Sequence, residues 1–385
     1  MADTWTIDAI RRWTCDFFKK NNIDSPQLDA DVLLADTLGV ERIQLLICGD
    51  QILTQDELAR FKERIVRRAR QHEPVAYILG KKEFWSLELK VTRDTLIPRP
   101  DTECLVEAAL QAIRAKNKLT QPRVDDGENL REYPQNQELT REILPDERLA
   151  SYVELWADQD AQNDITDEDI ARQQAIPEVD ETGAPIASRD IYADIEHEAP
   201  PNDQTTVSQP DTPATKDELR IVDIGTGSGA IAIALASELK TEPASITAVD
   251  ISEQALAVAK ENAITHGFNK IKFIQSNLLD EFNESFDLIV SNPPYVSEDE
   301  YKNVSDEVKH EPKLALTAEN QGLSVYKRLV PQSFSHLSHG GTLAVEIGAT
   351  QADAVSDLFK RAGFENVCIK PDYAGLPRVV LGSKP

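Results

Sequence analysis

The stretch FDLIVSNPPY, residues 286–295, joins a short apolar run to a corner stiffened by two prolines. Its apolar centre, residues 288–290, is bounded by polar and turn-forming residues, the pattern of a strand buried on both faces of a parallel sheet. The corner follows the strand directly, so it lies at the edge where open α/β sheets bind ligands. The stretch therefore predicts an α/β fold and a candidate site at the corner.

The chemistry of this corner favours a planar guest that carries N–H bonds. The two prolines fix φ at consecutive positions and remove two backbone donors, which leaves the carbonyls of Asn292 and Pro293 free to accept hydrogen bonds. The N–H groups of a guest can reach the Asn292 side-chain oxygen and the Pro293 carbonyl, while the Tyr295 ring packs on the flat face. An ordinary Pro-Pro turn is the alternative interpretation. The candidate substrate-binding residues are Asn292, Pro293, Pro294 and Tyr295.

A glycine-rich loop and an acid lie upstream in the same α/β pattern. A buried strand over residues 219–224 precedes the loop, and a helix over 230–239 follows it. A second strand, 246–249, ends in an acid that can accept both hydroxyls of a ribose. These features predict a ligand of the adenosine type. The candidate binding residues are Gly225, Thr226, Gly227, Ser228, Gly229 and Asp250.

The rest of this half continues the α/β pattern. Further strands are expected over residues 271–275, 342–347, 367–370 and 378–381, which gives a Rossmann-like sheet of about seven strands. The loop can also be aligned with the Gly-x-Gly-x-x-Ala fingerprint of dinucleotide-binding enzymes, so an NAD-linked oxidoreductase is a competing interpretation. The density of glycines looks more like the S-adenosylmethionine loop of class I methyltransferases. Hydride transfer needs no corner built for an N–H group, whereas methylation of nitrogen does.

The composition divides the chain into four parts. Residues 1–80 are expected to form a small helical domain, in which Thr54 and Glu57 make a capping box before an apolar stripe. Residues 81–116 are expected to form a hairpin and a linker helix, and 219–385 the α/β domain. Residues 117–218 are acidic and have no sustained apolar period, which predicts a disordered insertion, with a small structured domain as the other interpretation.

The charge and the cysteines exclude several classes of protein. The chain has 41 Lys and Arg against 67 Asp and Glu, which argues against a general phosphate-backbone binder and against direct contact with nucleic acid. Residues 119–218 hold 26 acidic and 7 basic residues, a net −19, so the remainder carries only −7 of the total −26. The four cysteines lie far apart, so neither a metal site nor a disulfide framework is indicated. We expect a cytoplasmic monomer without a membrane segment.

The segment IPRPDTE, residues 97–103, precedes the linker helix. Pro-Arg-Pro cannot be helical, whereas Asp101 or Thr102 can cap the helix that follows. Such a stiff loop aimed at the sheet could cover a bound ligand, with Arg99 and Glu103 as its reactive-looking ends.

Taken together, these motifs resemble the protein-(glutamine-N5) methyltransferases that modify class 1 peptide chain release factors. The resemblance rests on the Asn292 corner, on IPRPDTE, on the pattern Pro-x-x-Tyr-Ile-Leu-Gly at 74–80 and on Glu-Ile-Gly at 346–348. It covers residues 1 to about 116 and 219–383, and the corner alone is shared with DNA adenine methyltransferases. The insertion has no counterpart in the family pattern, and Leu278 stands where some members place a tryptophan beside the adenine.

The resemblance implies a class I methyltransferase that uses S-adenosyl-L-methionine to methylate the glutamine of the release factor's Gly-Gly-Gln motif. It implies that residues 1–80 recognise the substrate and that Leu278 and Asn292 also contact the cofactor. Asn292, Pro293 and Tyr295 are the implied catalytic residues, because alignment of the amide nitrogen is most of this catalysis. The alternatives are a glutamine on a ribosomal protein, an adenine N6 in nucleic acid, and a cofactor-binding protein that works only by docking.

Overall fold

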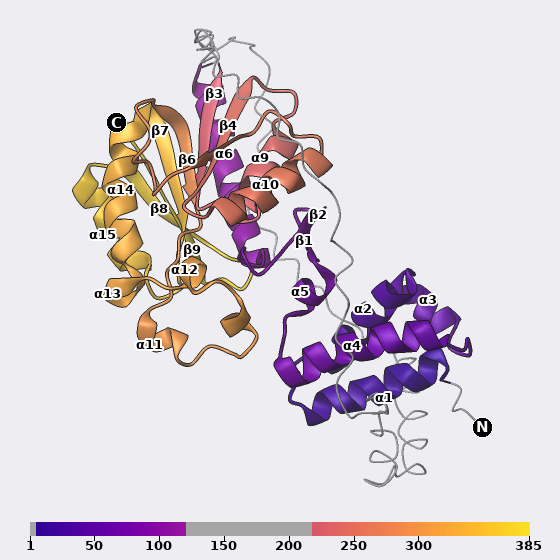
Figure 1. Ribbon diagram of the computed structural model, residues 1–385. Helices are drawn as coiled ribbons and strands as arrows, with labels where there is room; N and C mark the ends of the chain where they lie inside the picture. Colours follow the sequence, from indigo (N-terminus) through magenta and orange to yellow (C-terminus); the bar gives the residue numbers. More distant parts are fainter. Residues whose placement is uncertain (1–4, 121–217) are drawn as a thin grey trace, which may run out of the picture. The chain divides into compact units, whose positions relative to one another are not determined.

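The computed structural model describes residues 5–120 and 218–385 (Figure 1). The expectation of a disordered insertion at 117–218 falls almost wholly outside the described residues. The described helices and 3₁₀ turns are α1 (Ile7–Lys20), α2 (Pro26–Leu38), α3 (Arg42–Ile47), α4 (Gln55–Gln71), α5 (Val75–Leu79), η1 (Pro100–Thr102), α6 (Glu103–Thr120), α9 (Ala230–Glu238), α10 (Glu253–Thr265), α11 (Glu298–Tyr301), η2 (Val308–His310), α12 (Lys313–Leu316), α13 (Glu319–Gly322), α14 (Ser324–His336) and α15 (Ala352–Ala362). The strands are β1 (Lys81–Phe84), β2 (Leu87–Lys90), β3 (Leu219–Ile224), β4 (Ala244–Asp250), β5 (Lys272–Gln275), β6 (Phe286–Ser291), β7 (Leu337–Glu346), β8 (Glu365–Pro371) and β9 (Pro377–Ser383).

The main sheet has seven strands in the order β5-β4-β3-β6-β7-β9-β8. The first five strands in this order run parallel, and β9 is antiparallel to both of its neighbours. The strand order reverses between β3 and β6, so their carboxyl ends flank the crevice where ligands bind in open α/β sheets. The hydroxyl of Ser291 ties the two strands together there by donating to the Ile224 carbonyl, at 2.7 Å. The predicted seven-stranded α/β fold is confirmed.

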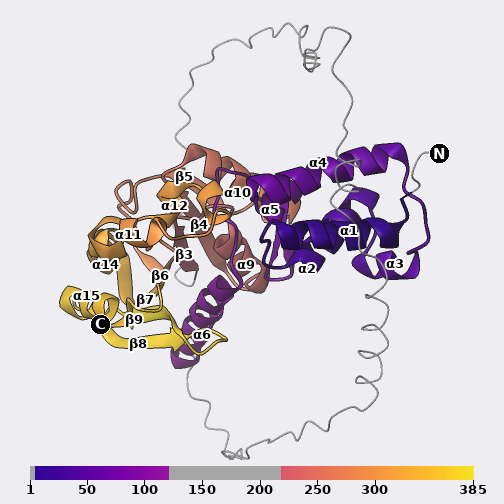
Figure 2. The ribbon, with the colours of Figure 1, turned by 90° about the horizontal axis from the view of Figure 1, so that it is seen from below.

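Helices cover both faces of this sheet, and each face buries its own apolar cluster. Residues of α6, α9 and α10 pack on one face with alternate residues of β3, β4 and β6, while α14 and α15 pack on the other (Figures 1 and 2). The central strands bury nearly every residue, which explains why their sequences are continuous apolar runs rather than alternating ones. A polar residue at the end of such a strand is therefore conspicuous.

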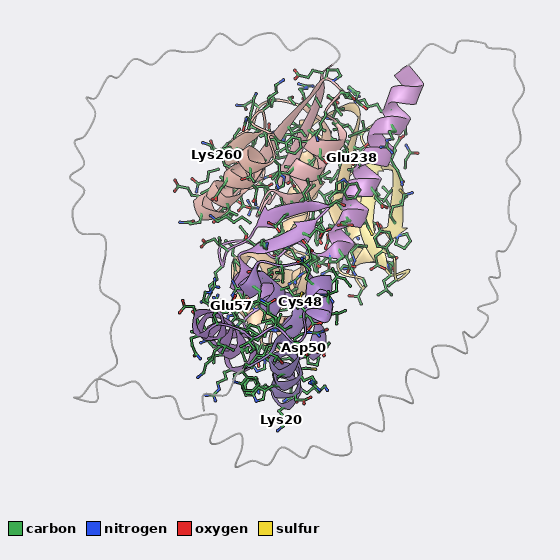
Figure 3. The ribbon with its side chains drawn as sticks, turned by 90° about the vertical axis from the view of Figure 1, so that its right-hand side faces the viewer. Lys20, Cys48, Asp50, Glu57, Glu238 and Lys260 are labelled. Carbon is green, nitrogen blue, oxygen red and sulfur yellow. The ribbon has the colours of Figure 1, made fainter. Side chains whose placement is uncertain are left out.

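The first five helices have a core of their own. As predicted, Thr54 caps α4: its hydroxyl accepts from the backbone of Glu57, at 3.3 Å, and the Glu57 carboxylate accepts from the Thr54 backbone, at 2.7 Å. Glu57 is labelled in Figure 3 near the start of that helix. Among residues 5–120 and 218–385, none of the helices combines the length and the apolar character needed to cross a bilayer.

The predicted hairpin is present as the antiparallel pair β1 and β2. Trp85 and Ser86 form the turn between β1 and β2 and both have positive φ, +53° and +56°, so Trp85 is not a strand residue. The Trp85 indole instead reaches α9, where it donates to the Glu238 carboxylate at 3.0 Å; Glu238 is labelled in Figure 3. The hairpin also donates from the Lys90 backbone to Asn262 of α10, at 2.8 Å. The hairpin is thus a side wall of the α/β domain.

Candidate active site

A cavity of about 440 Å³ lies at the carboxyl ends of β3, β4 and β6. Its wall takes residues from the loop after each of these strands and from the segments 93–96 and 312–315. Apolar surface dominates the wall, and polar groups enter it at a few points, as is typical of small-molecule sites. The predicted sites after β3, β4 and β6 are therefore brought to one cavity.

The glycine loop contributes backbone to this cavity. Gly225 and Gly227 line it and have φ of +72° and +55°, a region that disfavours any residue with a Cβ. The backbone N–H groups of Gly225 and Thr226 donate to the Val249 carbonyl of β4, at 2.8 and 2.9 Å, so the loop is bound to the neighbouring strand. The loop therefore approaches the cavity through its backbone and not through side chains.

Three of the predicted loop contacts do not line the cavity. Thr226, Ser228 and Gly229 hold the loop instead: the Thr226 hydroxyl donates to buried Asp223 at 2.7 Å, and the Ser228 carbonyl accepts from Asn262 at 2.9 Å. A Cβ at Gly229 would lie 3.0 Å from Ile233 and 3.1 Å from the Cβ of Ala259, closer than ordinary contact, and its φ of +84° also disfavours a side chain. Of the five predicted loop residues, Gly225 and Gly227 therefore line the cavity and the other three do not.

Asp223 is a residue that the sequence analysis did not single out. It is fully buried at the middle of the loop's contacts, and its Oδ2 also accepts from the Ala232 backbone at 3.1 Å. Burial raises the pKa of Asp223 to about 7, against the hydrogen bonds from Thr226 and Ala232 that favour the charged form. Its Oδ1 has no hydrogen-bond partner among the described residues. Asp223 therefore holds the loop through hydrogen bonds that its carboxylate accepts, and protonation of the carboxylate weakens them.

Asp250, the last residue of β4, lines the same cavity. Its two oxygens accept from the backbone N–H groups of Gly227 and Ser252, both at 2.9 Å. A carboxylate has about four acceptor positions, so acceptor capacity remains for a ligand. Burial raises the pKa of Asp250, while those backbone donors act in the opposite direction. The position is the one that the sequence predicts for an acceptor of ribose hydroxyls.

Leu278 also lines the cavity and has φ of +60°, an uncommon backbone conformation for a leucine. Ile251 and Leu314 line it too, although 49% and 65% of their surfaces are exposed. These three side chains give apolar surface suited to the flat face of a purine.

A smaller pocket of about 50 Å³ adjoins the cavity. The two share Leu96, Asn292, Pro293 and Ala315 as wall residues. The smaller one is completed by Arg99, by Tyr295 and Val296 after the corner, and by Leu316 of α12. Pro294 lines only the larger cavity. The corner after β6 therefore lies between the larger cavity and the smaller pocket.

The two acceptors predicted at the corner have no donor among the described residues. The Asn292 side chain uses its Nδ2 to donate to the Thr102 hydroxyl, at 3.1 Å, and neither Asn292 Oδ1 nor the Pro293 carbonyl accepts a hydrogen bond there. Thr102 is one of the two caps predicted for α6, but its hydroxyl oxygen accepts from Asn292 instead. Both acceptors are available to a guest.

Tyr295 is anchored to an acid on the next strand. Its hydroxyl donates to Oε1 of Glu346, the last residue of β7, at 3.3 Å, and burial followed by the Glu346 charge raises the Tyr295 pKa. Glu346 is 1% exposed, and its burial raises its pKa to about 7. In the sequence, Glu346 stands out only as part of a motif, although an acid at the end of a buried strand is also the signal that indicates Asp250.

The loop before α6 differs in part from its prediction. Arg99 lines the smaller pocket and forms an ion pair with Glu311, which is buried and also accepts from the Ile97 backbone at 2.9 Å. Glu103 lies elsewhere: its carboxylate accepts from the Trp85 backbone, at 2.9 Å, and supports the hairpin turn. Of the two expected ends of the loop, only Arg99 faces the site.

The cavity fits S-adenosylmethionine by its donor set. A backbone loop without side chains, one carboxylate with unused acceptor positions and an apolar wall suit an amino-acid end, a ribose and an adenine respectively. The small adjoining pocket offers acceptors for N–H groups beside them. An NAD-linked reaction would leave these acceptors without a purpose.

Comparison with known proteins gives concordant matches. The family described as the PrmC N-terminal domain matches residues 9–80, and the Methyltransferase small domain matches residues 210–321. Release factor glutamine methyltransferases are similar over nearly the whole chain. That of Fusobacterium nucleatum is 31% identical over 96% of this chain and 76% of its own length, that of Vibrio cholerae 31% over 98% and 96%, and that of Haemophilus influenzae 32% over 98% and 97%.

The fold, the cavity and these matches define a class I methyltransferase that uses S-adenosylmethionine as its methyl donor. Within that class, the chain belongs to the release factor glutamine methyltransferase family.

Proposed function

We propose that this protein transfers the methyl group of S-adenosylmethionine to the side-chain N5 of the glutamine in the Gly-Gly-Gln motif of class 1 peptide chain release factors. The observation that carries the proposal is the small pocket beside the cavity, in which two acceptors stand free at the corner after β6. A primary amide has two N–H bonds and a flat face, which are the features that this pocket recognises.

On the cofactor side, the residues bind and orient without a chemical role. The backbone at Gly225 and Gly227 would contact the amino-acid end, and Asp250 would accept the ribose hydroxyls. Leu278 would pack against the adenine. When bound, S-adenosylmethionine supplies a methyl group on a sulfonium, an electrophile that needs alignment rather than activation.

On the substrate side, the residues position the nitrogen. Asn292 Oδ1 and the Pro293 carbonyl would accept the two N–H bonds of the glutamine amide, and Tyr295 would pack on its plane. The amide lone pair is delocalised into the carbonyl, so two acceptors that draw on the N–H bonds favour the nucleophilic form of the nitrogen. Holding the nitrogen in line can supply an effective molarity on the order of 10⁵ M. The nitrogen loses its proton to solvent after transfer, so no dedicated base is required.

The remaining parts of the proposal follow if the substrate is a protein. We propose that the helical domain, residues 1–80, recognises the body of the release factor, and that the enzyme acts as a monomer in the cytoplasm, where translation terminates. No contact with nucleic acid or with a membrane is required for this reaction.

The test is methylation of a purified release factor with methyl-labelled S-adenosylmethionine, followed by tandem mass spectrometry of the Gly-Gly-Gln peptide. We expect one added methyl on the glutamine, none with a release factor whose glutamine is replaced by alanine, and none on naked DNA. A methyl on another residue, on a ribosomal protein only, or on adenine would contradict the proposal. Absence of any transfer, with intact binding of S-adenosylmethionine, would indicate a docking protein.

A further inference from the structure

Gln351 is the residue before helix α15, and its buried side chain contacts the corner that holds Tyr295. It follows the Glu-Ile-Gly motif at 346–348 by three residues and is 9% exposed. Its Nε2 donates to the carbonyls of Tyr295 and Gln321, at 3.0 and 3.2 Å, and its Oε1 accepts from the backbone N–H of Gly348, at 3.1 Å. One amide therefore joins the corner after β6, the turn at α13 and the turn after β7.

These three contacts leave only one orientation for the Gln351 amide. Both partners of Nε2 are carbonyl oxygens, which only accept, and the partner of Oε1 is an N–H group, which only donates. A flipped amide would set its oxygen against two oxygens and its NH₂ group against an N–H group, so all three hydrogen bonds would be lost at a buried position. The side chain is thus held in one position, with both of its N–H bonds on backbone carbonyls.

The turn that Gln351 holds is strained and lies against Tyr295. Asn320, Gln321 and Gly322 all have positive φ, +55°, +59° and +78°, a conformation that is costly for the first two residues. A Cβ at Gly322 would overlap the Tyr295 carbonyl oxygen and would lie 2.5 Å from Gln351 Nε2, so the glycine permits this close approach. The two hydrogen bonds from Gln351 therefore hold the strained turn and the corner together.

The Tyr295 side chain is held by the same connection between β7 and α15. Its hydroxyl donates to Glu346, five residues before Gln351. A Cβ at Gly348 would lie 3.5 Å from Cδ2 of the Tyr295 ring, so the ring lies directly against this turn. Tyr295 lines the smaller pocket, whereas Gln351 lines neither the pocket nor the cavity. Gln351 can therefore act on a guest only through the residues that it holds.

We propose that Gln351 is a positioning residue, which fixes the backbone of Tyr295 so that the ring packs on the plane of the substrate amide beside Asn292 Oδ1 and the Pro293 carbonyl. For the identity of that substrate, the inference rests on the proposed function. The position of Tyr295 is a property of the free enzyme, so it can be measured without turnover.

The first experiment observes Tyr295 in the free enzyme. In the full chain with ¹³C-labelled tyrosine rings, the Tyr295 signal is assigned by its loss in Tyr295→Phe. We expect Gln351→Met, which keeps the length of the side chain but removes both N–H donors, to move this signal by more than its linewidth.

Val355→Ala is the matched control for a general loosening of α15. Val355 lies one turn after Gln351, on the same helix, and is fully buried in the apolar core. Its truncation weakens the packing of the helix and keeps the Gln351 contacts. We expect Val355→Ala to leave the Tyr295 signal in place.

The second experiment measures turnover of the release factor. We expect Gln351→Met to lower kcat about tenfold, because a displaced ring no longer holds the amide in line. The dissociation constant for S-adenosylmethionine should stay within about twofold of wild type, and so should the kcat of Val355→Ala, measured below the melting temperature of each variant.

Gln351→Glu adds a rescue by pH. An ionised carboxylate sets an oxygen against the two carbonyls, whereas the protonated acid can donate its O–H to one of them and still accept from Gly348. We expect the kcat of Gln351→Glu, divided by that of wild type, to rise about threefold or more from about pH 8 to about pH 6, and the Tyr295 signal to return toward its wild-type position. The titratable groups on the surrounding elements are common to both proteins, so their titration is divided out: Tyr295 of the corner, Glu319 of α13, Glu346 of β7, Asp353 of α15 and Arg378 of β9.

The outcomes separate the two proposals. A Tyr295 signal that stays in place in Gln351→Met, or that moves equally in Val355→Ala, would overturn the positioning role while wild-type methylation stands. If Gln351→Met does not fold, Gln351→Glu decides, and a kcat ratio and a Tyr295 signal that do not change with pH would overturn the role. A Tyr295 signal that moves only in the Gln351 variants supports the role even if the wild-type enzyme methylates no release factor, in which case only the proposed function fails.

Discussion

The cavity has two sides that are built in different ways. The side after β3 and β4 is contiguous in the sequence: a glycine loop and one acid, Asp250, supply most of it through the backbone. The side after β6 and β7 depends on side chains that meet only in the fold, since Asn292 is held by Thr102 and Tyr295 by Glu346. One side suits a ligand shared by many enzymes, and under the proposed function the other selects a particular nitrogen.

This difference predicts which property, cofactor binding or turnover, a substitution on each side of the cavity changes. A change on the β3 and β4 side should weaken binding of the cofactor and leave the chemistry of the bound complex intact. A change on the β6 and β7 side should leave binding of the cofactor intact and reduce turnover. Variants that mix the two effects would show that the sides are not independent.

The largest effect is expected at Asn292. Asn292→Ala removes the oxygen that orients the nitrogen, so we expect single-turnover methylation to fall by at least ~100-fold. Binding of S-adenosylmethionine, measured by calorimetry, should change little, and so should the melting temperature. A variant with near-normal turnover would remove Asn292 from the mechanism, and a large fall in stability would favour the ordinary structural turn.

The next largest effect is expected at Asp250. Asp250→Ala leaves two ribose hydroxyls without their acceptor, so the binding free energy of S-adenosylmethionine should weaken by ~1 to 3 kcal/mol. Calorimetry measures this change, and kcat at saturating cofactor should stay within a few-fold of wild type. Unchanged affinity would show that the ribose is held elsewhere.

Two buried acids should give the two sides different dependences on pH. Glu346 has a pKa raised to about 7 by burial, so it becomes protonated below pH 7 and its negative charge beside the Tyr295 hydroxyl is lost. We therefore expect kcat at saturating substrates to decline as pH falls below about 7, and Glu346→Gln to flatten this decline. Arg378, which acts on Glu346 as a positive charge, has a raised pKa and stays charged through this range.

Asp223 titrates in the same range on the other side, because burial raises its pKa to about 7. Its protonation removes an acceptor from the glycine loop, so it should appear in the affinity for S-adenosylmethionine and not in kcat. Calorimetry across pH, with Asp223→Asn as the comparison, checks this. A pH dependence of kcat that survives in Glu346→Gln and vanishes in Asp223→Asn would reverse the assignment.

The smallest effect is expected at Leu278. Leu278→Ala removes apolar surface from the cavity wall, and we expect a loss of several-fold in affinity for S-adenosylmethionine, ~1 kcal/mol. Titration by calorimetry is sensitive enough to detect it. Leu278→Trp tests the same contact in the opposite sense, because a larger flat surface should strengthen binding if the adenine lies there.

The sequence predicted the fold and the two ends of the site, and its failures have a physical pattern. Buried parallel strands are continuous apolar runs, so each strand and the polar residue after it could be identified, as with Asp250 and Asn292. The role of Thr102 could not, because its partner is 190 residues away and a threonine before a helix is usually a cap. Glu346 could have been found by the rule that identified Asp250, since it too ends a buried strand.

The glycine loop shows the same limit at a finer scale. The sequence treats its five residues alike, whereas backbone conformation decides that Gly225 and Gly227 face the cavity and that Thr226 turns inward to Asp223. Residue type alone does not show which loop residues face the cavity and which face inward, because a small polar residue suits either position.

The central claim is that the corner after β6 holds the substrate amide by two acceptors. It is tested most directly by a crystal structure of the full chain with S-adenosylhomocysteine and a release factor bound. The account predicts the glutamine nitrogen within hydrogen-bond distance of both Asn292 Oδ1 and the Pro293 carbonyl, with Asn292 Nδ2 still on Thr102. A glutamine held by other residues, or an Asn292 that donates to the glutamine oxygen, would contradict it.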